Sequence, residues 1–214
     1  MRIVVASKNP DKLREVEAVL ARLGPPVEVV DDADWPDVAE TADDLEGNAL
    51  LKARAAAAAT GLAAIADDTG LEVEALGGAP GVYSARYAGP RATYAENVAK
   101  LLAELEGVAD RRARFRTVVA FVTPDGREAT VEGVLEGRIT TEPRGEGGFG
   151  YDPVFEVDGR TLAELSEEEK NRISHRARAL RRLAELLDET VNAPEPRSEG
   201  RDRDPGERTA VNPS

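Results

Sequence analysis

The segment Ser7-Lys8-Asn9-Pro10-Asp11-Lys12 contains residue types that could hold phosphate groups. Asn9 is a favourable N-cap and Pro10 a favourable first helical residue, so a helix should begin here with Lys12 in its first turn. A cation in that turn opposes the helix dipole by roughly 0.3–1 kcal/mol, unless an anion also binds the free amides. The segment therefore indicates a phosphate site, although it is not a Walker loop. A capped helix with an ordinary surface lysine is the alternative.

Two adjacent carboxylates, Asp67 and Asp68, follow the apolar run Leu62 to Ala66. We expect them at the end of a strand, on opposite faces, because side chains alternate along a strand. Carboxylates beside buried apolar residues are costly unless they are paired or bound to a cation, and Mg²⁺ prefers carboxylate and phosphate oxygens. The pair predicts a magnesium site next to a phosphate. A polar strand exit, in which one aspartate caps a turn, is the alternative.

Two later segments could recognise a base. The glycine-rich segment Gly145 to Phe155 contains Phe149 and Tyr151, and glycines let a backbone approach a ligand while an aromatic face can stack on a base. Ser174-His175-Arg176 holds the only histidine of the chain and offers hydrogen-bond donors to a carbonyl. Packing of the aromatic residues in the core and a simple helix cap at His175 are the alternatives.

The elements that must position these residues alternate between strands and helices. Apolar periodicity predicts strands at residues 2–6, 27–30 and 62–66, and helices at 10–23, at 45–60, from Thr93 to Gly107 with Tyr94 on the buried side, and from about 174 onward. An antiparallel hairpin joins 115–123 to a strand ending near 139. This order predicts an α/β fold in which helices cover both faces of a mixed sheet.

Composition limits the class of protein. With 41% hydrophobic residues in 214, we expect one domain at 1–191, followed by a disordered C-terminal tail at 192–214. Because there is no cysteine, any metal must bind to oxygen ligands. The net charge of −13 argues against a general nucleic-acid binder, whereas a triphosphate needs only a local basic pocket. No run approaches the roughly 20 apolar residues of a membrane span, and no secretory signal is evident, so we expect a cytoplasmic protein without a membrane partner.

Taken in order, these segments resemble the inosine and xanthosine triphosphate pyrophosphatases, a family that clears non-standard purine nucleotides. The resemblance covers about Met1 to Leu187. It rests on Ser7-x-Asn9-x-x-Lys12, Glu40-Thr41 with Glu46-x-Asn48-Ala49, Ala66-Asp67-Asp68-Thr69-Gly70-Leu71, Leu76-Gly77-Gly78-Ala79-Pro80-Gly81-Val82-Tyr83-Ser84-Ala85-Arg86-Tyr87, Gly148-Phe149-Gly150-Tyr151-Asp152-Pro153 and Ser174-His175-Arg176.

The resemblance implies a two-lobed α/β fold around a mixed sheet with a central substrate cleft, a homodimer, and Mg²⁺ as cofactor. The implied reaction hydrolyses ITP, dITP or XTP between the α and β phosphates, giving a monophosphate and pyrophosphate. By position, Asp68 and Lys12 are the implied catalytic residues, and Glu40 and Asp68 the implied metal ligands. The implied substrate contacts are Ser7, Lys8, Asn9, Pro10, Asp11, Lys12, Thr69, Phe149, Gly150, Tyr151, Asp152, Lys170, His175 and Arg176.

Physical chemistry supports this selectivity. The 6-keto group of hypoxanthine or xanthine accepts a hydrogen bond where the amino group of adenine donates one. Arg176, and His175 if protonated or in a suitable tautomer, could donate there, and adenine would then leave buried donors unpaired at roughly 1–3 kcal/mol each. Guanine is also a 6-keto purine, so its exclusion must depend on its 2-amino group.

Two other functions stay open. The related septum-associated nucleotide pyrophosphatases share the architecture and prefer pyrimidine or modified nucleotides, but Ser174-His175-Arg176 argues against that family. A non-catalytic nucleotide-binding or interaction module, whose tail engages a basic partner, is disfavoured because Asp68 and Lys12 are both present.

Overall fold

The computed structural model describes residues 1–23, 28–30 and 33–192. Residues 193–214 of the tail predicted at 192–214 lie outside the described residues. Residue 27, the first of the strand predicted at 27–30, also lies outside them. No helix in the described part of the chain is long and apolar enough to cross a membrane.

Strands and helices alternate in the first half of the chain, and a hairpin follows, as the sequence predicts. The strands are β1 Arg2–Val5, β2 Glu28–Val29, β3 Ala63–Val73, β4 Pro80–Gly81, β5 Arg112–Val122, β6 Glu128–Ile139, β7 Phe155–Val157 and β8 Arg160–Thr161. The α-helices are α1 Pro10–Leu23, α2 Leu45–Thr60, α3 Tyr94–Glu104, α4 Glu167–Ile173 and α5 His175–Asn192. Short 3₁₀ turns are η1 Glu74–Leu76, η2 Ser84–Arg86, η3 Asp152–Val154 and η4 Leu162–Glu164.

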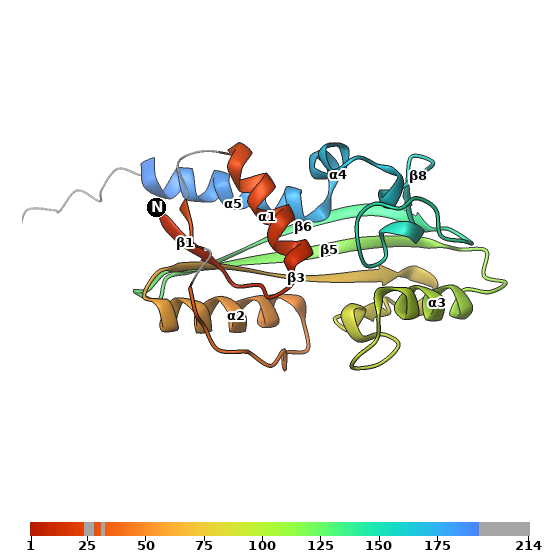
Figure 1. Cartoon of the computed structure of the whole chain (residues 1–214), viewed down its shortest axis with the longest axis horizontal. Helices are drawn as coiled ribbons and strands as arrows, with labels where there is room; N and C mark the ends of the chain where they lie inside the picture. Colours follow the sequence, from red (N-terminus) through yellow and green to blue (C-terminus); the bar gives the residue numbers. More distant parts are fainter. Residues whose placement is uncertain (24–27, 31–32, 193–214) are drawn as a thin grey trace, which may run out of the picture.

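The strands form one mixed sheet in the order β2-β1-β3-β5-β6-β7-β8, and β4 adds to β3. β1 pairs in parallel with β2 and β3, whereas the remaining pairs are antiparallel. Helices α1, α4 and α5 lie on one side of the sheet, and α2 and α3 lie on the other (Figure 1). The predicted α/β class with a mixed sheet and flanking helices is confirmed.

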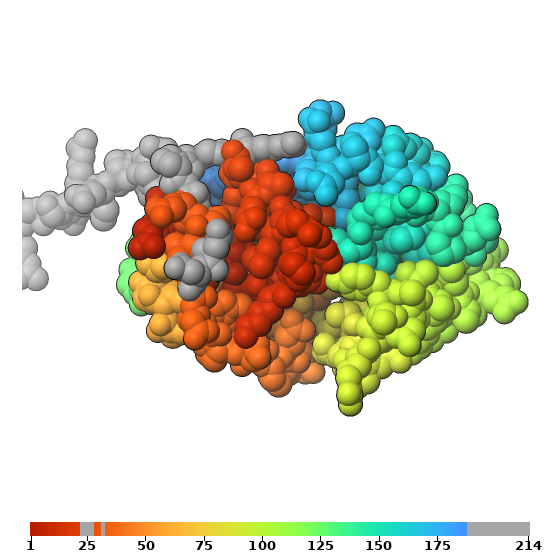
Figure 2. Space-filling model, in the orientation of Figure 1, coloured from red at the N-terminus to blue at the C-terminus, as the bar shows by residue number. Residues whose placement is uncertain are grey.

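The long strands β3, β5 and β6 extend through two lobes, each with its own core. In the first lobe, one apolar cluster packs the sheet against α1 and α5, and a second packs it against α2. A third cluster, which includes Leu71, Leu101 and Phe155, fills the second lobe. Polar residues occupy the middle of the strands between these cores, so the lobe boundary is the natural place for a site. Figure 2 shows a hollow on this face, where the red and orange first lobe meets the yellow-green residues.

Asp67 and Asp68 lie in the middle of β3, so the expectation of a strand end was wrong. β1 pairs with β3 only as far as Ile65, whereas β5 pairs with β3 as far as Val73. The strand therefore continues past the carboxylates because its other neighbour still supplies hydrogen-bonding partners. What ends at Ile65 is the parallel pairing, and this leaves one edge of β3 open beside the aspartates.

The predicted helix starts are confirmed by their caps. The side-chain oxygen Oδ1 of Asn9 accepts a hydrogen bond from the amide of Asp11 at 2.9 Å, and α1 begins at Pro10. Thr93, where the third helix was predicted to start, forms a capping box with Glu96. Ser166 forms a capping box with Glu169 at the start of α4, a helix that was not predicted above. Tyr94 was wrongly placed in the core, because it is 44% exposed and turns from α3 toward the first lobe.

Gly133 on β6 lies directly beneath the first turn of α5. A Cβ at this position would approach the carbonyl oxygen of His175 to 2.0 Å and the amide nitrogen of Ala179 to 2.5 Å. Because both are backbone atoms, the helix itself would have to move. We expect Gly133→Ala to lower the free energy of unfolding by roughly 1–3 kcal/mol, as overpacking does elsewhere, in urea denaturation. Glu136→Ala, at an exposed position of the same strand, is the control, and wild-type stability of Gly133→Ala would contradict this account.

Candidate functional site

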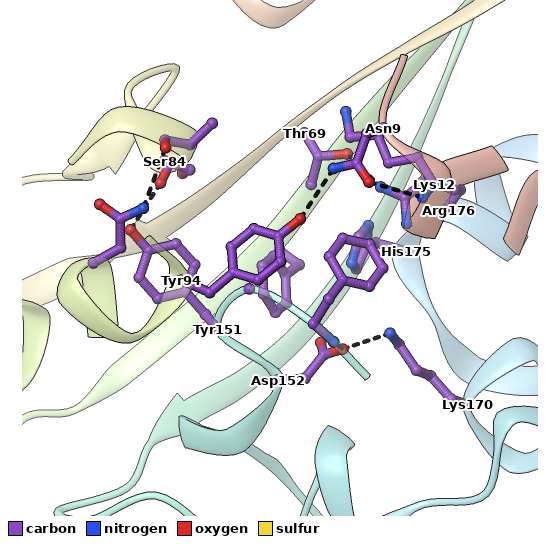
Figure 3. A pocket seen from close by; sticks show the side chains of 15 residues that line it. Asn9, Lys12, Thr69, Ser84, Tyr94, Tyr151, Asp152, Lys170, His175 and Arg176 are labelled. Carbon is purple, nitrogen blue, oxygen red and sulfur yellow. Dashed lines mark hydrogen bonds and ion pairs between the residues drawn. The ribbon is translucent and has the colours of Figure 1, made fainter. Parts of the chain in front are cut away.

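Two adjoining cavities lie at the boundary between the lobes. The first encloses about 620 Å³ including its mouth, and Figure 3 shows the side chains that line it. The second encloses about 860 Å³ on the side of α2. Asn9, Lys12, Thr69 and Ala85 line both cavities, so a single elongated ligand could occupy the two together.

The first cavity has aromatic walls. The ring centroids of Tyr94 and Phe149 are 6.0 Å apart, and His175 stacks on Phe115 with a centroid distance of 4.6 Å. Phe149 also lies close to cations, because the Nζ of Lys170 is 4.8 Å from its centroid. Flat walls of this kind suit a planar heterocycle such as a nucleotide base.

The second cavity contains carboxylates and lysines. The Nζ of Lys52 is 2.8 Å from Oε1 of Glu40 and 3.5 Å from Oδ1 of Asp68, and it also donates to the backbone carbonyl of Asp67 at 2.7 Å. Asn48 donates its side-chain amide to Oδ2 of Asp68 at 3.2 Å. Burial raises the pKa of Asp68 despite Lys52 and Lys12 nearby. Burial also acts to raise the pKa of Glu40, but Lys52, Lys12 and Arg86 together outweigh it and the net pKa is lowered.

Asp67 faces the opposite side of β3, as the alternation of a strand requires. Its Oδ2 is 3.2 Å from the Nζ of Lys12 and 3.2 Å from both Nε and Nη2 of Arg176. Burial alone would raise the pKa of Asp67, but these two cations hold it well below the usual range of a carboxyl group. The adjacent aspartates therefore differ in kind. Asp67 is a permanent counter-ion, whereas Asp68 is the better proton acceptor.

A buried ion network forms the floor of the first cavity. Glu15 on α1 pairs with both Lys170 and Arg176, and Lys170 also binds Asp152 at 2.5 Å. Asp152 in turn accepts the amide of Phe149 at 2.8 Å, so the network holds the aromatic wall in place. Four hydrogen bonds of Arg176 go to Asp67, Thr69 and Glu15, which leaves one Nη1 hydrogen for a ligand.

The structure brings most of the predicted site residues together. Residues of the first cavity are Asn9, Lys12, Thr69, Phe149, Gly150, Tyr151, Asp152, Lys170, His175 and Arg176. Ser7, Lys8, Glu40 and Asp68 line the second. Pro10 and Asp11 line neither: Pro10 is an exposed first residue of α1, and Asp11 pairs with Arg14 and receives a hydrogen bond from Tyr94 at 3.3 Å.

The oxygen donors of the second cavity fit a magnesium ion. Mg²⁺ typically takes one or two carboxylates and completes its shell with water and substrate phosphates. Glu40 and Asp68 supply that number, and the described residues contain no cluster of three or more potential ligands that would suit a fully protein-bound metal. The two carboxylates share one ammonium, that of Lys52, and Arg86 reaches Glu40 at 3.5 Å.

Sequence reasoning missed Lys52, Glu15 and Thr117. Lys52 could have been found, because it is a lysine on the alanine-rich buried face of α2, next to Ala49 and Ala53. Glu15 gives no such signal, because a glutamate in the second turn of an amphipathic helix is ordinary. Thr117 reads as one more β-branched residue in a strand.

Comparison with known proteins agrees with this arrangement. The sequence model of the Ham1 family matches residues 3–186. A dITP/XTP pyrophosphatase of Bacillus licheniformis is 51% identical over 192 residues, covering 87% of this chain and 98% of its own. One of Symbiobacterium thermophilum is 54% identical over 190 residues, covering 87% and 94%. The solved structure of a HAM1 protein from Coxiella burnetii superposes with a TM-score of 0.79 at 46% identity, covering 88% of this chain and 99% of that one.

Proposed function

The chain belongs to the Ham1 family, and from this premise we propose that it hydrolyses the non-standard purine nucleoside triphosphates ITP, dITP and XTP to a monophosphate and pyrophosphate. Its relatives at about half identity carry the name dITP/XTP pyrophosphatase, and they match over nearly their whole length. Such similarity supports both the reaction class and the substrate class.

The observation that carries the proposal is the pair of cavities that share Asn9, Lys12, Thr69 and Ala85. One has aromatic walls for a base, and the other has carboxylates and lysines for a metal-bound triphosphate. Lys12 stands where the two meet, in the first turn of α1. The amides of Asp11 and Lys12 are bound by the Asn9 side chain, so the Lys12 ammonium group and the positive end of the helix dipole are what can hold an anion there.

Hydrolysis between the α and β phosphates needs a positioned water molecule and neutralised charge. Lys12 and Lys52 supply positive charge to the second cavity. Asp68, with its raised pKa, accepts the proton of the attacking water, and Asn48 orients its carboxylate. The α–β anhydride bond breaks as the new P–O bond forms, and pyrophosphate leaves.

Glu40 and Asp68 would hold the magnesium ion. When bound, the ion would supply further charge neutralisation on the phosphates. Lys52 now provides the counter-charge of both carboxylates, so a bound cation would compete with it for Glu40.

The proposal is tested with a substrate panel. With magnesium present, we expect kcat/KM for ITP, dITP and XTP to exceed that for ATP and GTP by at least about tenfold, the factor that one unmatched buried hydrogen-bonding group supplies. The released product should be pyrophosphate. Orthophosphate, or equal rates on all five nucleotides, would count against the proposal. UTP is assayed beside them, and faster hydrolysis of UTP than of dITP would favour the septum-associated family.

Magnesium removal gives a second result. In the same assay with EDTA, we expect hydrolysis of dITP to fall to background and to return when excess Mg²⁺ is added, because two lysines alone would not supply the charge neutralisation that a bound cation would add. Full activity after exhaustive chelation would contradict the metal assignment.

The homodimer and the cytoplasmic location that the sequence analysis expects stay predictions.

A further inference from the structure

A line of hydroxyl groups connects the buried carboxylate of Asp67 to the ring of His175. Oγ1 of Thr69 donates to Oδ2 of Asp67 at 3.2 Å. Oγ1 of Thr69 and Oγ1 of Thr117 are 2.7 Å apart, and Oγ1 of Thr117 is 2.5 Å from Nδ1 of His175. Neighbouring strands bring the threonines together, because Thr69 on β3 and Thr117 on β5 are directly paired.

The number of protons available along this line determines which atom donates in each hydrogen bond. Thr69 accepts from the guanidinium of Arg176 at 3.3 Å, and an ionised Asp67 can only accept. The single Thr69 hydroxyl proton goes to the anion, because a charge-assisted hydrogen bond is the stronger choice. Thr117 must then donate its proton to Thr69, and it is left only lone pairs to offer His175. Every contact in the line then contains one proton, whereas the reverse direction leaves the oxygens of Thr69 and Asp67 facing each other without one.

The position of the proton on the His175 ring decides what the ring offers to a ligand in the first cavity. The ring is 4% exposed, stacks on Phe115 and lines the first cavity (Figure 3). Burial, with Arg176 and Lys170 nearby, lowers its pKa well below the usual value, so the ring is neutral and carries one proton. Within the described part of the chain, Thr117 is the hydrogen-bonding partner of the ring, through Nδ1, and Nε2 has none.

We propose that Thr117 is a positioning residue that holds His175 in the Nδ1–H tautomer, so that Nε2 presents a lone pair to the base. This inference rests on the proposed function, in which the base is a 6-keto purine. The lone pair of Nε2 accepts a hydrogen bond from the N1–H of that base. Adenine has a lone pair at N1 and would place two acceptors face to face. Of the two donors to the 6-carbonyl that the sequence analysis named, the His175 side chain is then not available, and the spare Nη1 hydrogen of Arg176 is.

The tautomer can be observed without any substrate. His175 is the only histidine, so ¹⁵N-histidine labelling of the full chain, made without a histidine tag, gives signals from this ring alone. In a two-bond ¹H–¹⁵N correlation spectrum at pH 8, the protonated and unprotonated ring nitrogens have widely different shifts. We expect a protonated Nδ1 and an unprotonated Nε2. A protonated Nε2 with an unprotonated Nδ1 would overturn the proposal.

Variants of Thr117 test its part. Thr117→Val keeps the shape and removes the hydroxyl, so we expect the ring to lose its fixed Nδ1–H form and kcat/KM for dITP to fall about tenfold, the effect of one lost hydrogen bond. Thr117→Ser should restore both the spectrum and the rate. Thr130→Val, on β6 and hydrogen-bonded to Glu46, is the matched control and should change neither. The role of Thr117 would be overturned if Thr117→Val kept the wild-type ring spectrum. It would also be overturned if Thr117→Ser showed the same altered spectrum and rate as Thr117→Val.

The two proposals fail separately. If the wild-type ring shows the Nδ1–H form and the variants change it as expected, but dITP is not hydrolysed, the tautomer assignment stands and the proposed function falls. If dITP is hydrolysed selectively but Nε2 carries the proton, the function stands and the role of Thr117 falls.

Discussion

Asp68→Asn is expected to lower kcat for dITP by about 10³-fold while substrate binding persists, in line with the usual loss of a general base. Asparagine has nearly the same shape, so the hydrogen bond with Asn48 and the packing against α2 can be kept. What it lacks is the ability to accept a proton from water and to bind magnesium as an anion. Because Lys12, Lys52 and the aromatic cavity are unchanged, the nucleotide still has most of its contacts.

Single-turnover kinetics and equilibrium binding of dITP separate the two effects. We expect the dissociation constant for dITP to change by less than about tenfold, since only one of the many side chains that contact the nucleotide is altered. Asp125→Asn, which removes one negative charge in the exposed turn between β5 and β6, should leave both quantities unchanged. Full turnover by Asp68→Asn would contradict the assignment of Asp68 and reopen the hypothesis of a non-catalytic binding module.

Asp67→Asn is expected to destabilise the protein by about 3–5 kcal/mol, the usual cost of removing one partner of a buried ion pair. Asp67 is 4% exposed, and its Oδ2 meets Lys12 and Arg176. Without the carboxylate, the side chain of Arg176, which is 3% exposed, keeps only Glu15 as an anionic partner among the residues that the structure describes. Urea denaturation of the variant and the wild type at pH 7 measures the difference. An unchanged free energy of unfolding would contradict the role of Asp67 as counter-ion.

The difference in stability should depend on pH in a defined direction. The pKa of Asp67 is lowered in the folded protein, so its carboxylate stabilises the fold fully above about pH 5, where the unfolded aspartate is also ionised. As the pH falls below about 3.9, the unfolded form takes up a proton and the advantage over Asp67→Asn shrinks. Asp68 has the opposite shift, because burial raises its pKa. Asp68→Asn should therefore be as stable as the wild type or more stable at pH 7, which makes it the matched control in the same experiment.

Much of the site could be predicted because its signals are local. Asn9 and Pro10 specify the start of α1 through capping and backbone geometry, and these act within a few residues. The opposite faces of Asp67 and Asp68 follow from strand alternation alone. The ordered motifs also carried the resemblance to the family, which the comparisons confirm.

The length of β3 and the partners of its carboxylates were decided only by the tertiary structure. β3 continues past Asp68 because β5, more than 40 residues further on, supplies its hydrogen bonds. Asp67 becomes a fixed counter-ion because Arg176 lies 109 residues away along the chain but beside it in the fold. The amino-acid sequence by itself determined which side chains are present and on which face of its element each one points. Which cation or hydroxyl each of them meets depends on how the elements pack, because Coulomb energies and hydrogen bonds depend on distances in space that no local rule contains.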